Sequence, residues 1–122
     1  MQEQRRYIRY DTEGNAILKP EDGTSRNLKA DLVDISYAGL GVAVYGKIET
    51  GIKVKFELIT RLYDRPIIGE GKVKYLQEIQ GKDASIFRLG IEFTNINNED
   101  IRCVINSIQE DLCAEARRKR TG

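Results

Sequence analysis

Apolar and charged side chains alternate strictly along the segment IKVKFEL, which runs from Ile52 to Leu58. The four apolar residues of this segment point to one face and the three charged residues to the other. A period of two residues is that of a β-strand with one buried and one solvated face. Because such a strand is stable only within a larger sheet, the segment predicts a β-rich fold.

Five other short runs of β-forming residues flank this strand, at residues 15–19, 28–35, 40–44, 66–76 and 87–93. Turn residues separate the runs. The clearest case is Pro20-Glu21-Asp22-Gly23, where Pro fixes φ and Gly permits a positive φ. Six strands at near-regular spacing with short polar connections predict a closed all-β barrel or a sandwich. A chain of 122 residues suits one such domain.

The hydrophobic period changes near the C-terminal end. Ile101, Val104, Ile105, Ile108 and Leu112 recur at helical spacing. Acidic residues before this stripe and a basic run after it, at 117–120, both suit the dipole of a helix. The sequence therefore predicts a helix over about residues 98–117 that packs one apolar stripe on the barrel.

The charge balance and the residue inventory exclude several classes of function. Lys and Arg total 20 and Asp and Glu total 19, so the net charge of +1 does not favour binding to DNA by bulk electrostatics. The chain has no His, which removes the commonest general base and the commonest transition-metal ligand. We therefore expect neither an enzyme nor a metal site.

The sequence also favours a cytoplasmic location. It has no run of 18 or more apolar residues, and no hydrophobic segment follows the first residues, so we expect no membrane span and no secretory signal. Cys103 and Cys113 would lie about 15 Å apart along the predicted helix, which is too far for a disulfide. Free thiols suit a reducing compartment.

Two short motifs carry the residues best suited to bind a ligand. Arg5 and Arg9 form R-x-x-x-R on the charged segment 1–11, which we interpret as a flexible arm. Asp34, Ser36 and Gly39 form D-x-S-x-x-G where the second strand ends. Arg offers a planar fork of donors for phosphate oxygens or for guanine O6 and N7. A carboxylate accepts hydrogen bonds from guanine N1–H and from its amino group.

Each motif also has a purely structural interpretation. Paired arginines in a chain rich in Lys and Arg often form only a solvated basic face, and Asp-x-Ser in a turn often holds its own backbone. Gly39 suits a close approach to a ligand or a turn with positive φ. Tyr7, Tyr10 and Tyr37 flank the motifs, where they suit either stacking on a base or burial at strand edges.

Together the motifs resemble those of the PilZ domain family over nearly the whole chain. The R-x-x-x-R and D-x-S-x-x-G segments match the family's two motifs in type and order. Leu40-Gly41-Val42 and Leu89-Gly90-Ile91-Glu92-Phe93 are typical of its later segments. The resemblance implies a six-stranded antiparallel β-barrel with a C-terminal helix over residues 12–122, preceded by the arm at 1–11.

The resemblance further implies that the chain binds the second messenger cyclic di-GMP and signals to an unidentified downstream protein. In the family the arginines of the arm hold phosphates and guanine bases, and the Asp and Ser positions meet a guanine edge from the barrel. The implied ligand residues are Arg5, Arg9, Asp34, Ser36 and Gly39. Further candidates are Arg6, which equally suits a solvated neighbour, and Gln4, which precedes the motif. No cofactor besides this ligand is implied.

Two other functions stay open at this point. A PilZ-like interaction module would work through protein contacts without ligand, although the intact arginines argue against it. A barrel that binds single-stranded nucleic acid needs a charged groove lined with aromatics, and 7% aromatic residues give that little support. We expect a monomer or weak dimer, with no DNA partner and with an arm that orders on ligand binding.

Overall fold

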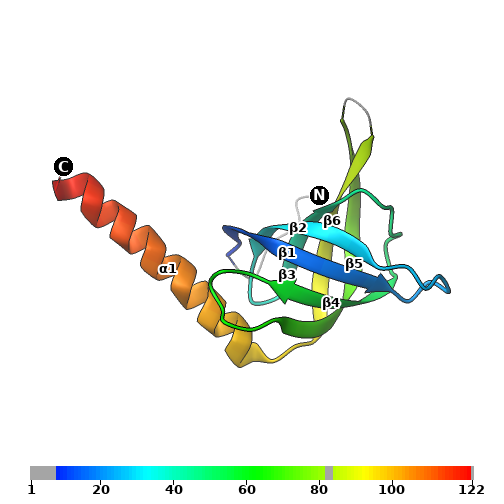
Figure 1. Ribbon diagram of the computed structural model, residues 1–122, viewed down its shortest axis with the longest axis horizontal. Helices are drawn as coiled ribbons and strands as arrows, with labels where there is room; N and C mark the ends of the chain where they lie inside the picture. The colour runs from blue at the N-terminus through cyan, green and yellow to red at the C-terminus, as the bar shows by residue number, and fades with distance from the viewer. Residues whose placement is uncertain (1–7, 82–83, 122) are drawn as a thin grey trace.

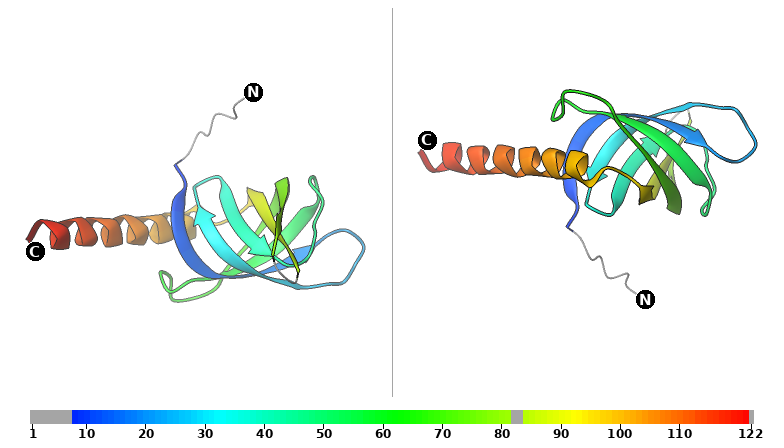
Figure 2. Two further views of the ribbon diagram at one scale, coloured as in Figure 1. Left: turned by 90° about the horizontal axis from the view of Figure 1, so that it is seen from above. Right: turned by 90° about the horizontal axis from the view of Figure 1, so that it is seen from below.

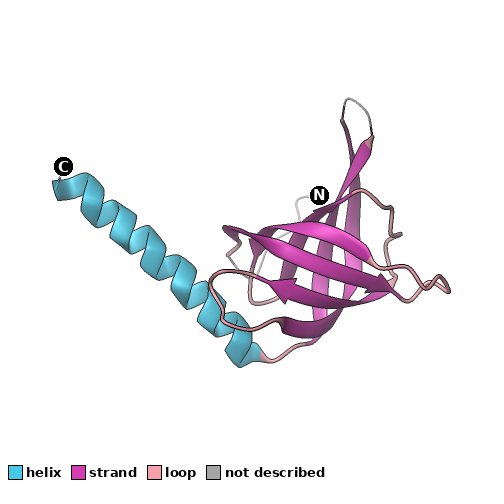
Figure 3. Ribbon diagram, viewed as in Figure 1, coloured by secondary structure: helices cyan, strands magenta, loops and turns pink. Residues whose placement is uncertain are grey.

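A computed structural model describes residues 8–81 and 84–121, which form a β-barrel with one helix at its C-terminal end (Figure 1). The elements are β1 (Tyr10–Pro20), β2 (Leu28–Ile35), β3 (Gly39–Val44), β4 (Lys53–Ile59), β5 (Ile67–Gln80), β6 (Ser85–Asn95) and α1 (Asn98–Thr121). The strands close in the order β1-β2-β3-β6-β5-β4, and each neighbouring pair is antiparallel. The predicted six-stranded barrel with a C-terminal helix is confirmed (Figure 3).

The alternation in β4 has the predicted cause. Val54, Phe56 and Leu58 are buried, whereas Lys53 and Lys55 are exposed. The inward-facing residues of the other strands complete one core, which includes Leu18, Ile35, Val42, Ile67, Val73 and Leu89. Full burial of an aliphatic side chain contributes about 1.5–3 kcal/mol. The barrel is therefore held mainly by its interior.

The first strand is longer than the sequence pattern predicts. β1 begins at Tyr10, five residues before the expected start at Asn15, and its first residues pair with the end of β2 across a register shift between Asp11 and Gly14. A shift of this kind interrupts the alternation that sequence analysis relies on. Tyr10 and Asp11, which we assigned to the arm, therefore belong to the barrel.

The first half of α1 is fixed to the barrel. Asn97 Oδ1 accepts a hydrogen bond from the Glu99 N–H at 3.0 Å and so caps the helix. Four apolar residues of the first turns are buried: Ile101, Val104, Ile105 and Ile108. The Tyr63 hydroxyl, in the β4–β5 loop, donates to Asp100 Oδ1 at 2.6 Å, and this bond raises the pKa of Tyr63.

The second half of α1 extends past the end of the barrel, as the views in Figures 1 and 2 show. The expectation that the whole apolar stripe packs on the barrel is therefore wrong for Leu112, which is 55% exposed. Cys103 and Cys113 are free thiols and are also exposed. Within the described residues, no helix is both long and apolar enough to cross a membrane.

Candidate functional site

Four strands contribute one residue each to a row on the outer face of the barrel. Its members are successive cross-strand partners, and we call them the outer row: Asp34 in β2, Gly41 in β3, Gly90 in β6 and Tyr75 in β5. The residues that flank the two glycines along their strands are buried in the core. Because successive residues of a strand point to opposite faces, the outer row faces away from the core.

Two register shifts turn the ends of the outer row outward. One lies between Leu32 and Asp34 in β2, and the other between Val73 and Tyr75 in β5. Leu32 and Val73 are buried in the core, and in a regular strand a residue two positions further on would also point inward. The extra residue of each bulge reverses that direction. The bulges therefore bring Asp34 and Tyr75 to the same outer surface.

The two central members of the outer row must be glycines, because side chains from the flanking strands lie over them. A Cβ at Gly41 would overlap the carboxylate of Asp34, and a Cβ at Gly90 would overlap the ring of Tyr75. The Asp34 carboxylate thus lies against Gly41 and the Tyr75 ring against Gly90. These two glycines are cross-strand partners, so the carboxylate and the ring occupy neighbouring positions on the sheet. This packing gives a physical reason for the glycines in the LGV and LGIEF segments.

Asp34 has a cationic partner from a strand two positions away. Arg88 Nη2 in β6 donates to Asp34 Oδ2 at 3.4 Å, and the side chain of Asp34 is only 9% exposed. Because β3 lies between β2 and β6, the Arg88 side chain crosses β3 to reach the carboxylate. Asp11 of β1 is the cross-strand partner of Asp34 on the other side. The positive charge of Arg88 therefore offsets the repulsion between the neighbouring carboxylates of Asp11 and Asp34.

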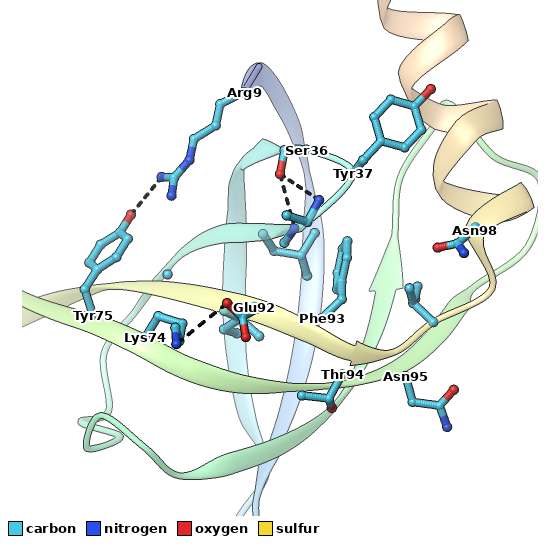
Figure 4. A pocket seen from close by; sticks show the side chains of 16 residues that line it. Arg9, Ser36, Tyr37, Lys74, Tyr75, Glu92, Phe93, Thr94, Asn95 and Asn98 are labelled. Carbon is cyan, nitrogen blue, oxygen red and sulfur yellow. Dashed lines mark hydrogen bonds and ion pairs between the residues drawn. The ribbon is translucent and has the colours of Figure 1, made fainter. Parts of the chain in front are cut away.

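Arg9 covers the opposite end of the outer row. Its Nη1 donates to the Tyr75 hydroxyl at 3.3 Å, and its guanidinium carbon lies 5.7 Å from the centre of the Tyr75 ring (Figure 4). This geometry is that of a cation–π contact. Arg9 directly precedes β1, so the contact joins the end of the predicted arm to β5.

Ser36 shapes the turn between β2 and β3. Its Oγ accepts hydrogen bonds from the N–H groups of Ala38 at 3.0 Å and Gly39 at 3.2 Å. The Ser36 N–H also donates to the Gly39 carbonyl at 2.9 Å. The structural interpretation is therefore correct for this serine, which holds its own backbone. Both lone pairs of the hydroxyl are engaged, so it retains only a proton to donate to a ligand.

Gly39 is required for close packing and not for an unusual backbone conformation. Among the described residues, positive φ values occur only at Gly23 and Gly51. A Cβ at Gly39 would overlap the carbonyl oxygen of Ile91 in β6. Of the two interpretations of this glycine, the positive-φ turn is thus excluded, and the close approach is to a neighbouring strand.

A cavity of about 630 Å³ opens beside the outer row (Figure 4). Arg9, the β2–β3 turn, β5, β6 and the start of α1 line it. Its walls combine cationic, aromatic and polar groups, among them Lys74, Tyr37, Tyr75 and Asn98. Lys74 Nζ forms an ion pair with Glu92 Oε2 at 3.7 Å at the rim. Such a lining suits a ligand that has both anionic and flat aromatic parts.

The structure brings several of the predicted site residues together. Arg9, Ser36 and Gly39 all line the cavity, although they come from two separate motifs. Asp34 does not line the cavity, and its carboxylate lies nearly buried at the far end of the outer row. Arg5, Arg6 and Gln4 lie outside the described residues. The ligand-binding roles of all these residues stay predictions.

Sequence reasoning missed Tyr75 and Arg88. Neither belongs to a motif, and they meet their partners across 66 and 54 residues of chain, respectively. The only local signal was the glycine of the LGIEF segment, because a glycine inside a strand often leaves space for a neighbouring group. That signal indicates a close approach but does not identify the residue that makes it.

The fold is that of a small closed β-barrel domain with its candidate site on the outer wall and one helix after the last strand. The PilZ domain model matches residues 3–110, which is most of the sequence. The chain therefore belongs to the PilZ domain family. No curated protein matches it in sequence.

Solved PilZ structures share the fold at low sequence identity. The PilZ domain of YcgR from Escherichia coli, solved with c-di-GMP, superposes with a TM-score of 0.73 at 19% identity, covering 93% of this chain and 98% of that one. Bacillus subtilis MotI gives 0.69 at 18% identity, covering 90% and 52%. The K. pneumonia MrkH–c-di-GMP complex gives 0.69 at 21% identity, covering 96% and 55%. The chain thus spans about half the length of MotI and MrkH.

Proposed function

We propose that this chain is a receptor domain for cyclic di-GMP, a cyclic dinucleotide with two guanine bases and two phosphate charges. The observation that carries the proposal is the grouping of Arg9, Tyr75 and Asp34 on the outer wall of a PilZ barrel. These three groups are a cation, a flat aromatic ring and a carboxylate, which are the partners that a guanine nucleotide needs. The related structures of YcgR and MrkH with this ligand support the assignment.

Each predicted ligand residue has a chemical role in this proposal. Arg9 exchanges its contact with Tyr75 for a ligand phosphate or base, and Arg5 supplies a second guanidinium from the same motif. Asp34 accepts hydrogen bonds from a guanine edge, and Ser36 donates its remaining proton. Gly39 has no side chain, so the turn at this residue packs closely on β6 and leaves the cavity beside it open. Further candidates are Arg6, which lies within the arm motif, and Gln4, which directly precedes it.

We also propose that the ligand orders the arm and thereby changes the surface that a partner protein sees. Binding in this scheme needs no chemical step, and the role is that of a receptor and not of an enzyme. The support is the composition of the arm, which has too few apolar residues to offset the entropy of ordering by itself. Ligand phosphates would neutralise its arginines.

Calorimetric titration with cyclic di-GMP tests the function directly, with GMP and a single-stranded oligonucleotide as controls. We expect Arg9→Ala to weaken binding by about 2–4 kcal/mol, because a charge-assisted contact to the ligand is lost. Arg9→Lys should not restore it, because Lys lacks the planar fork. Arg61→Ala is the matched control, since Arg61 pairs with Asp111 on the helix.

The salt dependence of binding separates the alternatives. A ligand with two phosphates predicts a log–log slope of roughly −2 or shallower. A slope several times steeper, seen with the oligonucleotide, would instead favour a nucleic-acid-binding barrel. Absence of cyclic di-GMP binding by the unaltered chain would favour an interaction module that works without ligand.

A further inference from the structure

The ion pair of Asp34 and Arg88 places a hydrogen-bond acceptor beside a donor at one end of the outer row. Asp34 Oδ2 and Arg88 Nη2 lie 3.4 Å apart, and the side chains are 9% and 36% exposed. Both residues belong to strands of the closed barrel. The sheet therefore fixes the backbone positions from which the carboxylate and the guanidinium meet.

The protein itself satisfies this pair only in part. The contact at 3.4 Å is longer than the 2.7–2.9 Å typical of charge-assisted bonds, and it is the only hydrogen bond that the described residues make to the Asp34 carboxylate. Arg88 Nε is buried and has no hydrogen-bond partner among those residues. Buried polar groups without partners are costly. A ligand would not reach the buried Nε, but it could add partners to the Asp34 carboxylate and to the Nη groups of Arg88, whose side chain is 36% exposed.

The Watson–Crick edge of guanine complements such a pair. It offers the acceptor O6 beside two donors, N1–H and the amino group at C2, so a carboxylate can accept from the donors while a guanidinium donates to O6. Adenine reverses both groups, because it has an amino group at C6 and an unprotonated N1. Adenine would therefore place an N–H group against Arg88 and a lone pair against Asp34.

We propose that Arg88 is a specificity-determining residue that reads guanine O6 while Asp34 reads N1–H and the C2 amino group. This inference rests on the proposed function and deepens it, because it assigns base selectivity to a residue of β6 outside both sequence motifs. It also explains why Arg88 reaches across β3: the guanidinium must lie beside the carboxylate to complete the pattern.

Three cyclic dinucleotides distinguish the atoms that each residue reads: cyclic di-GMP, cyclic di-IMP and cyclic di-AMP. Hypoxanthine keeps O6 and N1–H but lacks the C2 amino group, whereas adenine lacks O6 as well. We expect Arg88→Met to weaken cyclic di-GMP about tenfold or more, since one charge-assisted bond is lost. The variant should prefer cyclic di-GMP over cyclic di-AMP less strongly than the unaltered chain does. Its preference for cyclic di-GMP over cyclic di-IMP should persist, because Asp34 is retained.

Two further variants complete the experiment. Arg88→Lys keeps a donor beside Asp34 and should recover most of the discrimination against cyclic di-AMP. Arg61→Met, on the helix side of the barrel, should leave all three affinities unchanged. If Arg88 merely held Asp34 in place, Arg88→Met would reduce both preferences together, and that result would overturn the inference. Unchanged preferences in Arg88→Met would overturn it equally.

The unaltered chain provides a test that does not depend on the folding of a variant. Its affinities should fall in the order cyclic di-GMP, cyclic di-IMP, cyclic di-AMP, and equal binding of the last two would contradict the reading of O6. Failure to bind any of the three refutes the proposed function itself. The two failures are therefore distinguishable, and circular dichroism of each variant confirms that it is folded.

Discussion

At the residue scale, the candidate site depends on a glycine as much as on its charged groups. The three heavy atoms nearest to a Cβ built on Gly41 all belong to the side chain of Asp34. We expect Gly41→Ala to displace that carboxylate and to cost about 1–3 kcal/mol of unfolding free energy, as overpacking of a filled site does. Urea denaturation measures the change.

A double-mutant cycle tests the cause of that cost. In an Asp34→Ala background the overlapping carboxylate is gone, so the same Gly41→Ala change should cost much less. Equal costs in both backgrounds would show that Gly41 is needed for another reason, such as the backbone of β3. The cycle isolates the overlap because the loss of the Asp34–Arg88 ion pair is common to both chains in the Asp34→Ala background and cancels in the comparison.

The sequence motifs name candidate residues of the site but say little about what surrounds them. The motifs named Arg9, Ser36 and Gly39 as site residues, and the structure places all three around one cavity, while their roles in binding stay predictions. The outward turn of Asp34 was not predictable, because it depends on a bulge in the β2–β3 ladder. Arg88 was equally hidden, since its partner is far away in the chain and the pairing of β3 with β6 decides the contact.

At the scale of elements, α1 combines a packed half with an exposed half. Ile105 is fully buried against the barrel, whereas Leu112 lies beyond it and is 55% exposed. We expect Ile105→Ala to lower the unfolding free energy by about 2–5 kcal/mol, because it leaves a cavity in the core. Leu112→Ala should change it by no more than about 0.5 kcal/mol.

Denaturation of these two variants over a range of protein concentrations also tests the exposure of the helix. A large effect of Leu112→Ala that grows with concentration would mean that another copy of the chain covers this half in solution. Absence of any effect of Ile105→Ala would contradict the packing of α1 on the barrel.

The elements illustrate which sequence patterns carry spatial information. The alternation in β4 predicted its buried face, because the inner and outer faces of a strand are fixed by its own period. The apolar stripe of α1 predicted which side of the helix faces the barrel, but not where the barrel ends. Leu112 has the spacing of the stripe but no surface to pack on. Where the barrel ends is determined by the strands and not by the sequence of the helix.

At the scale of the whole molecule, Tyr10 lies where the arm, the site and the helix meet. It follows Arg9 in the chain, and its cross-strand partner is Ile35, which lies between Asp34 and Ser36. Its hydroxyl accepts a hydrogen bond from Gln109 of α1 at 3.0 Å. A change in the direction of the arm therefore begins at a residue that the barrel and the helix hold in place.

This arrangement leads to the last prediction, that the arm is the part of the molecule that responds to ligand. Residues 1–9 include Glu3, Arg5, Arg6 and Arg9, so we expect net positive charge and few apolar side chains to oppose ordering of the free arm. Two ligand phosphates offset that charge, and the bases offer flat surfaces for guanidinium stacking. The ligand can shift the equilibrium only by its greater affinity for the closed arm.

Amide hydrogen exchange on the free and ligand-bound chain measures this response. Residues 5–9 should gain protection with cyclic di-GMP, while β4, which lies opposite β3 in the closed strand order and lines no part of the cavity described above, should change little. Arg9→Ala provides the control, because its arm should gain less protection even at saturating ligand. An arm that is already fully protected without ligand would refute the switch and leave binding itself untouched, since Asp34, Ser36 and Tyr75 belong to the barrel and its turn.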